Sequence, residues 1–196
     1  MSIAQTRNVT FIDTVISRSR VSDVALVSAG VLITALAAQV SIPALPVNFT
    51  LQTLAVLLIG ATYGAARGAI TMGLYALVGV LGAPVFSDGA SGLSVLLSVR
   101  GGFIIGFIFA AALIGWMAEL NWSSNVLKMT ASYVLGSVAI YAVGIPVLAM
   151  LSPALNSDLV AATVAMSPYF VWDAVKALIA GALLPSAWAL VKSIKK

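Results

Sequence analysis

The chain has 196 residues, of which 61% are hydrophobic and 8% charged, whereas an average soluble domain has about 25% charged residues. This composition excludes a water-soluble globule and predicts an integral membrane protein. Cysteine and histidine are absent, which excludes disulfides, a zinc site of the usual type and a Ser/His/Asp triad. No segment matches the Walker pattern G-x-x-x-x-G-K-[ST], so any use of ATP must come from a partner.

The first predicted membrane span is the uncharged run Val24–Val47, which follows a polar segment, residues 1–23. Pro43 and Pro46 mark its exit, because each proline removes a helix hydrogen bond and clashes with the preceding turn. The alternative is a signal peptide with a candidate cleavage site at Ala35-Leu36-Ala37. The length of the polar segment and the five apolar segments that follow favour a span.

Five further apolar segments follow in the order Thr50–Tyr63, Gly68–Leu81, Gly101–Ala118, Met129–Leu151 and Tyr169–Val191. The first of these would extend only about 21 Å as a helix, against a hydrocarbon core of about 30 Å, and short segments of this kind often mark sites. We expect a tight turn at Gly64–Arg67 and a helix start at Ser167-Pro168. The sequence therefore predicts one all-α bundle of six transmembrane helices, residues 24–191, followed by a basic tail, residues 192–196.

The distribution of basic residues predicts the orientation of this bundle, because cytoplasmic loops are enriched in Lys and Arg. One side of the predicted bundle has eight basic residues, namely Arg7, Arg18, Arg20, Arg67, Lys128, Lys192, Lys195 and Lys196. The other side has Arg100 alone. We therefore expect both termini in the cytoplasm and outer loops at Ser41–Phe49, Ala83–Arg100 and Ser152–Pro168. Basic residues scattered at span ends do not favour a nucleic-acid partner.

The last apolar segment contains two ionisable residues, Asp173 and Lys176, spaced i,i+3 on one helix face. A charge at this depth costs about 2.5 to 3.5 kcal/mol on insertion scales, and such residues usually mark a ligand or ion path. An ion pair that only fixes helix packing is the alternative. Tyr169, Phe170 and Trp172 could wall a pocket for a flat ligand, although an interfacial aromatic belt is an equally good interpretation of Tyr169.

Two other groups of residues are candidates for binding. Asp88, in the loop Phe86-Ser87-Asp88-Gly89, and Arg100 lie on the same predicted outer side as Asp173. They are candidate ligand contacts, although short polar loops are more often plain solvated connections. On the first span, Ala25-x-x-x-Ala29 places small residues on one helix face. That face could receive another membrane subunit.

The sequence resembles the BioY family, the biotin-binding S-components of energy-coupling factor (ECF) transporters. The resemblance rests on four motifs: Asn48-Phe-Thr-Leu-Gln52-Thr-Leu, Gly79-Val-Leu-Gly82-Ala-Pro84-Val-Phe86, Gly101-Gly102-Phe-Ile-Ile-Gly106-Phe, and Asp173-x-x-Lys176. It implies a six-helix S-component in the bacterial cytoplasmic membrane. Such a protein takes biotin from outside and docks on a transmembrane coupling protein with two cytoplasmic ATPases.

The resemblance also implies roles for individual residues. Asp173 and Lys176 would contact the ring head of biotin, and Asp88 would be the polar residue that follows Val-Phe in the third loop. Gln52 and Phe86, within the matching motifs, join Tyr169 and Trp172 as candidate ligand-binding residues. Ser98-Val99-Arg100 departs from the Gly-Pro-Thr of many relatives, and our hypothesis is that Arg100 binds the tail carboxylate of biotin. Ala25 and Ala29 match the family's docking motif.

Biotin is then the transported ligand, and we expect no cofactor, metal or catalytic residue in this chain. Three alternatives stay open. The chain could be an S-component for another vitamin, such as thiamine or riboflavin. It could be an intramembrane enzyme that uses Asp173 as acid or base, or a structural membrane subunit without a ligand.

Overall fold

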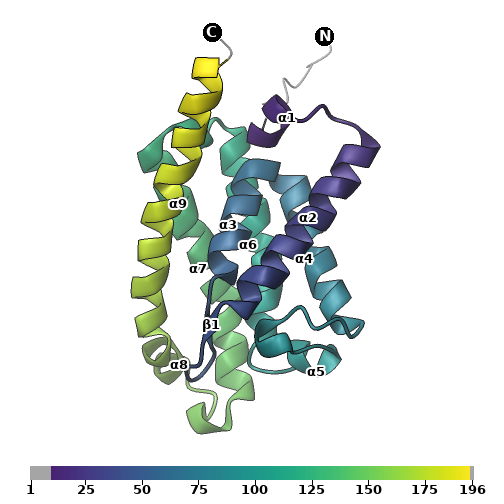
Figure 1. Ribbon diagram of the computed structural model, residues 1–196. Helices are drawn as coiled ribbons and strands as arrows, with labels where there is room; N and C mark the ends of the chain where they lie inside the picture. Colours follow the sequence, from purple (N-terminus) through teal and green to yellow (C-terminus); the bar gives the residue numbers. More distant parts are fainter. Residues whose placement is uncertain (1–9, 195–196) are drawn as a thin grey trace, which may run out of the picture.

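The computed structural model describes residues 10–194, which form nine α-helices, three short 3-10 helices and a small antiparallel sheet (Figure 1). The α-helices are α1 (Phe11–Val15), α2 (Arg20–Gln39), α3 (Gln52–Tyr63), α4 (Ala65–Val80), α5 (Leu93–Leu96), α6 (Gly101–Glu119), α7 (Val126–Leu151), α8 (Leu159–Ala165) and α9 (Ser167–Ile194). The 3-10 helices are η1 (Ser87–Gly89), η2 (Trp122–Ser124) and η3 (Pro153–Leu155). Strands β1 (Ser41–Ile42) and β2 (Phe49–Thr50) pair as a hairpin.

Six of these helices coincide with the six predicted apolar segments. Within the described residues, α2, α6, α7 and α9 are long and apolar enough to cross a membrane. Helices α3 and α4 have 12 and 16 residues and extend about 18 and 24 Å. The prediction of an all-α membrane bundle is confirmed, and the number of crossings stays a prediction.

The structure corrects the predicted boundaries at two places. Helix α2 begins at Arg20, where Ser19 caps it by accepting a hydrogen bond from the Ser22 amide at 3.0 Å, and it ends at Gln39, before the two prolines. The β1–β2 hairpin replaces the predicted end of this span and coincides with the predicted loop Ser41–Phe49. At the predicted turn only Gly64 is non-helical, with φ of 87°, because α4 already begins at Ala65.

Helix α6 forms the centre of the bundle, and most of its residues are buried. It packs against α3, α4 and α7, and glycines bring the helix axes close together. A Cβ atom at Gly106 would lie 2.9 Å from the backbone of Ile140 in α7, and one at Gly60 of α3 would lie 2.7 Å from the Ala111 carbonyl oxygen in α6. These contacts leave no room for a side chain, so glycine sets the spacing of the core helices.

The two ends of the bundle have different chemistry. Figure 1 shows α1 and the C-terminal end of α9 at one end, and the β1 hairpin, α5 and α8 at the other. At the α1 end, the buried Arg67 forms ion pairs with Asp13 at 2.7 Å and Asp23 at 2.8 Å. Arg67 was predicted as a rim charge, whereas it joins α1 and α2 to α4. Of the other predicted rim residues, Arg7, Lys195 and Lys196 lie outside the described residues.

The acidic partner in α1 has a shifted pKa. Burial alone would raise the pKa of the Asp13 carboxyl, but hydrogen bonds from Thr10 and Arg67, together with the charge of Arg67, outweigh burial and hold it below its usual range. Asp13 is therefore ionised at neutral pH, which keeps the ion pair formed.

Candidate ligand-binding site

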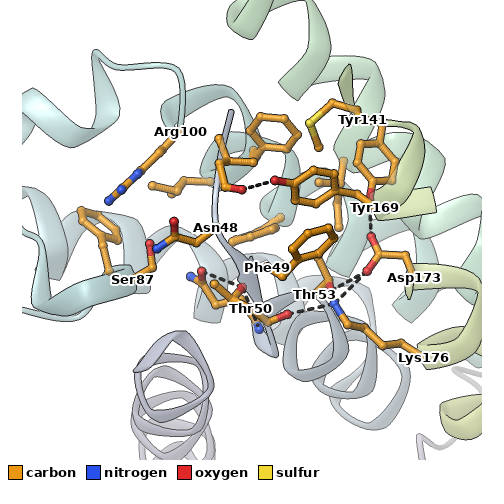
Figure 2. A pocket seen from close by; sticks show the side chains of 18 of the residues that line it. Asn48, Phe49, Thr50, Thr53, Ser87, Arg100, Tyr141, Tyr169, Asp173 and Lys176 are labelled. Carbon is orange, nitrogen blue, oxygen red and sulfur yellow. Dashed lines mark hydrogen bonds and ion pairs between the residues drawn. The ribbon is translucent and has the colours of Figure 1, made fainter. Parts of the chain in front are cut away.

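A pocket lies at the hairpin end of the bundle, enclosed by the hairpin, the η1 loop and helices α3, α6, α7 and α9 (Figure 2). Its polar lining residues are Asn48, Thr50, Gln52, Thr53, Ser87, Arg100, Tyr141, Tyr169, Asp173 and Lys176. Its apolar lining residues are Val47, Phe49, Phe86, Val95, Phe103, Ile104, Phe107, Ile140 and Met166. A cavity that combines apolar and aromatic walls with convergent polar groups is the usual form of a small-molecule site.

The polar centre of the pocket is the ion pair between Asp173 and Lys176 of α9. The Lys176 Nζ lies 2.9 Å from the Asp173 carboxylate, and the two side chains are 14% and 6% exposed. Asp173 also accepts hydrogen bonds from the hydroxyls of Thr53, at 3.0 Å, and Tyr141. Two charges in an apolar bundle are thus held as a fully hydrogen-bonded pair, which is the arrangement that burial of charge requires.

Lys176 also connects this polar centre to the hairpin. Lys176 Nζ donates to the Thr50 carbonyl oxygen and to the Thr53 hydroxyl, both at 2.8 Å. Helix α3 begins at Gln52, two residues after the last residue of β2, Thr50. This short connection brings Thr50 and Thr53 to the same side chain of α9. The ammonium therefore joins α9 to the hairpin as well as neutralising the carboxylate.

Aromatic side chains form the walls between the hairpin and α9. The rings of Phe49 and Tyr169 stack with centroids 3.9 Å apart and planes 16° apart, and the Tyr169 hydroxyl donates to the Val47 carbonyl oxygen. Tyr169 is 6% exposed, so its ring packs inside the protein and not on the surface of the bundle. The stacked pair gives the pocket a flat surface beside its polar centre.

Gln52 and Phe86 also line the pocket, and both are fixed by contacts within the protein. The Gln52 amide donates to the Tyr75 hydroxyl at 2.6 Å, and that hydroxyl donates to the Val85 carbonyl oxygen at 2.9 Å. The ring of Phe86, 1% exposed, packs edge-on against Tyr75. Gln52 and Phe86 therefore shape the wall, and the polar atoms of Gln52 are already engaged.

Arg100 and Asp88 lie at the mouth of the pocket, with side chains 34% and 47% exposed. Arg100 lines the pocket, and in Figure 2 it stands on the opposite side from Asp173. Asp88 does not line the pocket. Its carboxylate accepts hydrogen bonds from Ser41 at 3.0 Å and from Asn48, and it lies 3.6 Å from the Arg100 guanidinium. Asp88 therefore joins the hairpin to the η1 loop and to the start of α6.

The structure brings six of the eight predicted ligand-binding residues to one pocket: Asp173, Lys176, Arg100, Gln52, Phe86 and Tyr169. Asp88 lies at its rim. Trp172 lies outside its lining and is 56% exposed, because its position next to Asp173 turns it to the outer face of α9. Among residues 10–194 no three potential Asp, Glu, His or Cys ligands gather, so these residues offer no metal site.

Sequence reasoning missed two residues that hold the polar centre, Thr53 and Tyr141. Thr53 follows Gln52 within the motif Asn48-Phe-Thr-Leu-Gln52-Thr-Leu. This position, next to a predicted site residue, was the signal that could have identified Thr53 as part of the site. Tyr141 stands in the apolar segment of α7, where a tyrosine deep in a span signals a polar partner. Neither residue could be paired with Asp173 from spacing, because each lies on another helix.

The fold and the pocket define a multi-pass membrane protein with a small-molecule site at one end of its bundle. The chain belongs to the BioY family, whose model matches residues 7–193. The resemblance identified from the motifs is thereby confirmed.

Individual relatives support membership of the same family. The Biotin transporter BioY of Rhizobium etli is 33% identical over 166 residues, 81% of this chain and 87% of the relative. The protein of the same name from Thermotoga maritima is 40% identical over 111 residues, 57% of this chain and 64% of the relative. A solved structure, the S-component for biotin from an ECF-type ABC transporter, has a TM-score of 0.69 at 22% identity, and the match covers 87% of this chain and 94% of that one. That likeness shows that the fold is shared.

Proposed function

We propose that this chain is a biotin-binding S-component that mediates biotin uptake across the bacterial cytoplasmic membrane. Membership of the BioY family and relatives named as biotin transporters support the ligand. The observation that carries the proposal is the buried Asp173–Lys176 pair, which stands beside a flat aromatic wall in a pocket with one arginine at its mouth.

The chemistry of biotin matches this pocket from its ring to its tail. The ureido ring offers two N–H donors, which suit the Asp173 carboxylate. Its carbonyl is an acceptor for the Lys176 ammonium, which gives up its contact with the Thr50 carbonyl or the Thr53 hydroxyl when biotin binds. The ring face packs on the Phe49–Tyr169 wall, and the valerate tail runs towards Arg100. A guanidinium pairs well with a carboxylate because two parallel N–H groups can bind both oxygens.

Binding and transport are separate tasks in this proposal. The chain makes and breaks no bond. It takes biotin at the outer end of a six-span bundle with both termini in the cytoplasm, and a transmembrane coupling protein with two cytoplasmic ATPases supplies the energy. Ala25 and Ala29 are exposed on α2, which supports this helix as the docking face for the coupling protein.

Binding of labelled biotin to the purified protein tests the ring contacts. Asp173→Asn and Lys176→Met should each abolish measurable binding, because each removes one charged partner of the ureido ring. Lys128→Ala, an exposed position in the first turn of α7, is the matched control for loss of a cation and should bind normally. Normal binding by both α9 variants would contradict the proposal.

The tail contact and the choice of vitamin need two further measurements. Arg100→Ala should weaken biotin binding and remove discrimination against biotin amide, which lacks the tail charge. Normal affinity with full discrimination would refute the role of Arg100. Excess unlabelled thiamine or riboflavin should leave bound biotin in place, and displacement by either would favour an S-component for that vitamin.

A further inference from the structure

A second cavity lies behind the ligand pocket, on the outer surface of the bundle. It is an apolar groove of about 530 Å³ between α7 and α9, closed at one end by α8. Its apolar lining includes Val134, Val138 and Ile145 of α7, Leu159 of α8 and Phe170 of α9. Its volume lies within the range of about 300 to 1,000 Å³ that is typical of ligand sites.

The groove lies within the depth of the bilayer. Both α7 and α9 are long and apolar enough to cross a membrane, and Figure 1 shows α8 beside their ends at the hairpin side of the bundle. Along α7 the lining extends from Val134 to Pro146, about 18 Å of helix. Half of a hydrocarbon core measures about 15 Å, so the groove matches the depth of one leaflet.

The polar groups of the lining offer little to a polar ligand. The Thr163 hydroxyl donates to the Leu159 carbonyl oxygen of its own helix at 2.7 Å, and Asp173 is engaged in the ligand pocket. The Ser137 hydroxyl has no hydrogen-bond partner among the described residues. Ser137 is only 8% exposed, so neighbouring side chains shield this hydroxyl from a ligand in the groove. A hydrocarbon chain therefore fits this lining better than a headgroup does.

The wall between the groove and the ligand pocket is a single hydrogen-bonded pair. Tyr141 and Asp173 line both cavities, and they are the two residues that the linings share. The Tyr141 hydroxyl donates to the Asp173 carboxylate, and its ring packs edge-on against Phe170 in the groove, with centroids 4.8 Å apart. Whatever fills the groove packs directly behind the carboxylate of the polar centre.

We propose that the α7–α9 groove binds one acyl chain of an outer-leaflet lipid, and that this chain supports the Tyr141–Asp173 wall of the ligand pocket. The chain excludes water from the membrane side of the carboxylate and keeps Tyr141 in place. The link to ligand affinity rests on the proposed function, whereas the acyl-chain site itself does not.

Photocrosslinking tests the site independently of biotin. The protein is reconstituted in nanodiscs that contain a phosphatidylcholine with a diazirine in its acyl chain, irradiated, digested and mapped by mass spectrometry. Adducts should concentrate on the groove segments of α7 and α9. Ala142→Trp and Ala174→Phe, which fill the groove from either side, should remove those adducts. Ala131→Trp and Ala182→Trp, on exposed positions of the same helices outside the groove, should retain them. Adducts spread evenly over the exposed faces would overturn the site.

Biotin affinity with and without lipid tests the coupling. The unmodified protein in delipidated short-chain detergent should bind biotin about tenfold more weakly than in nanodiscs, the equivalent of one hydrogen bond to a charged group. Ala142→Trp should bind equally well in both, because its indole replaces the acyl chain. Equal affinity of the unmodified protein in both media would overturn the coupling. Absence of biotin binding in every sample would instead contradict the proposed function, and the crosslinking result would still decide the site.

Discussion

Removal of one partner of the Asp173–Lys176 pair should destabilise the fold as well as the ligand site. Breaking a buried ion pair costs about 3 to 5 kcal/mol, because it leaves a charge without compensation. In Asp173→Asn the ammonium keeps the Thr50 carbonyl and the Thr53 hydroxyl. In Lys176→Met the carboxylate keeps the hydroxyls of Thr53 and Tyr141. These remaining contacts place each single variant at the lower limit, about 3 kcal/mol.

The double variant distinguishes an ion pair from two independent side chains. With both charges removed, no uncompensated charge is left, so the double variant should lose no more stability than either single one. The coupling free energy is then about 3 kcal/mol, the upper end for residues in contact. Reversible unfolding in mixed micelles, followed by circular dichroism without biotin, gives the three free energies. Additive losses would refute the reasoning, since they would show that the two charges do not depend on each other.

Three further predictions concern other parts of the structure. The pKa of the Asp13 carboxyl is held low. The contribution of Asp13 to stability is therefore present above the ordinary carboxyl pKa of about 3.9 and is lost as the pH falls through the lower pKa of the folded state. Asp13→Asn should remove this pH dependence of the free energy of unfolding, and an unchanged dependence at acidic pH would contradict the prediction. Gly106→Val should destabilise the bundle by about 2 kcal/mol or more through overpacking. Gly73→Ala is the control and should not, because the space around its Cβ position is open. Equal unfolding midpoints for the two variants would count against the close packing of α6. Asp88→Ala should speed dissociation of bound biotin in stopped-flow measurements without loss of fold, because it removes the bridge between the β1–β2 hairpin and the η1 loop. An unchanged dissociation rate would show that this bridge does not hold the mouth of the pocket closed.

The helices and the charged centre were predictable from the sequence for clear physical reasons. Long apolar segments have few alternatives to helices in a bilayer, because every backbone polar group must be satisfied within the segment. Asp173 and Lys176 stood out because an apolar segment does not tolerate ionisable residues without partners. The i,i+3 spacing already placed the two on one face.

The hairpin and the partners of the charged centre were not predictable in this way. Strands of two residues carry no periodicity, so the segment Ser41–Phe49 could be identified only as a loop that overlaps the end of a span. Thr53 and Tyr141 reach Asp173 across helix contacts that the sequence does not encode locally. Asp88 was placed at the same end of the bundle as Asp173, but its backbone, with φ of 61°, directs it to the loops and not into the pocket lining.

Two side chains of α9 are held by main-chain atoms of the hairpin. Tyr169 donates to the carbonyl of Val47, and Lys176 donates to the carbonyl of Thr50. A carbonyl is supplied by every amino acid, so residues 47 and 50 can change in evolution without loss of either anchor. Pairwise covariation between α9 and the hairpin should therefore be weak at these positions, although they are in direct contact. Residue conservation in such a site would underestimate how much of the pocket is built from the backbone.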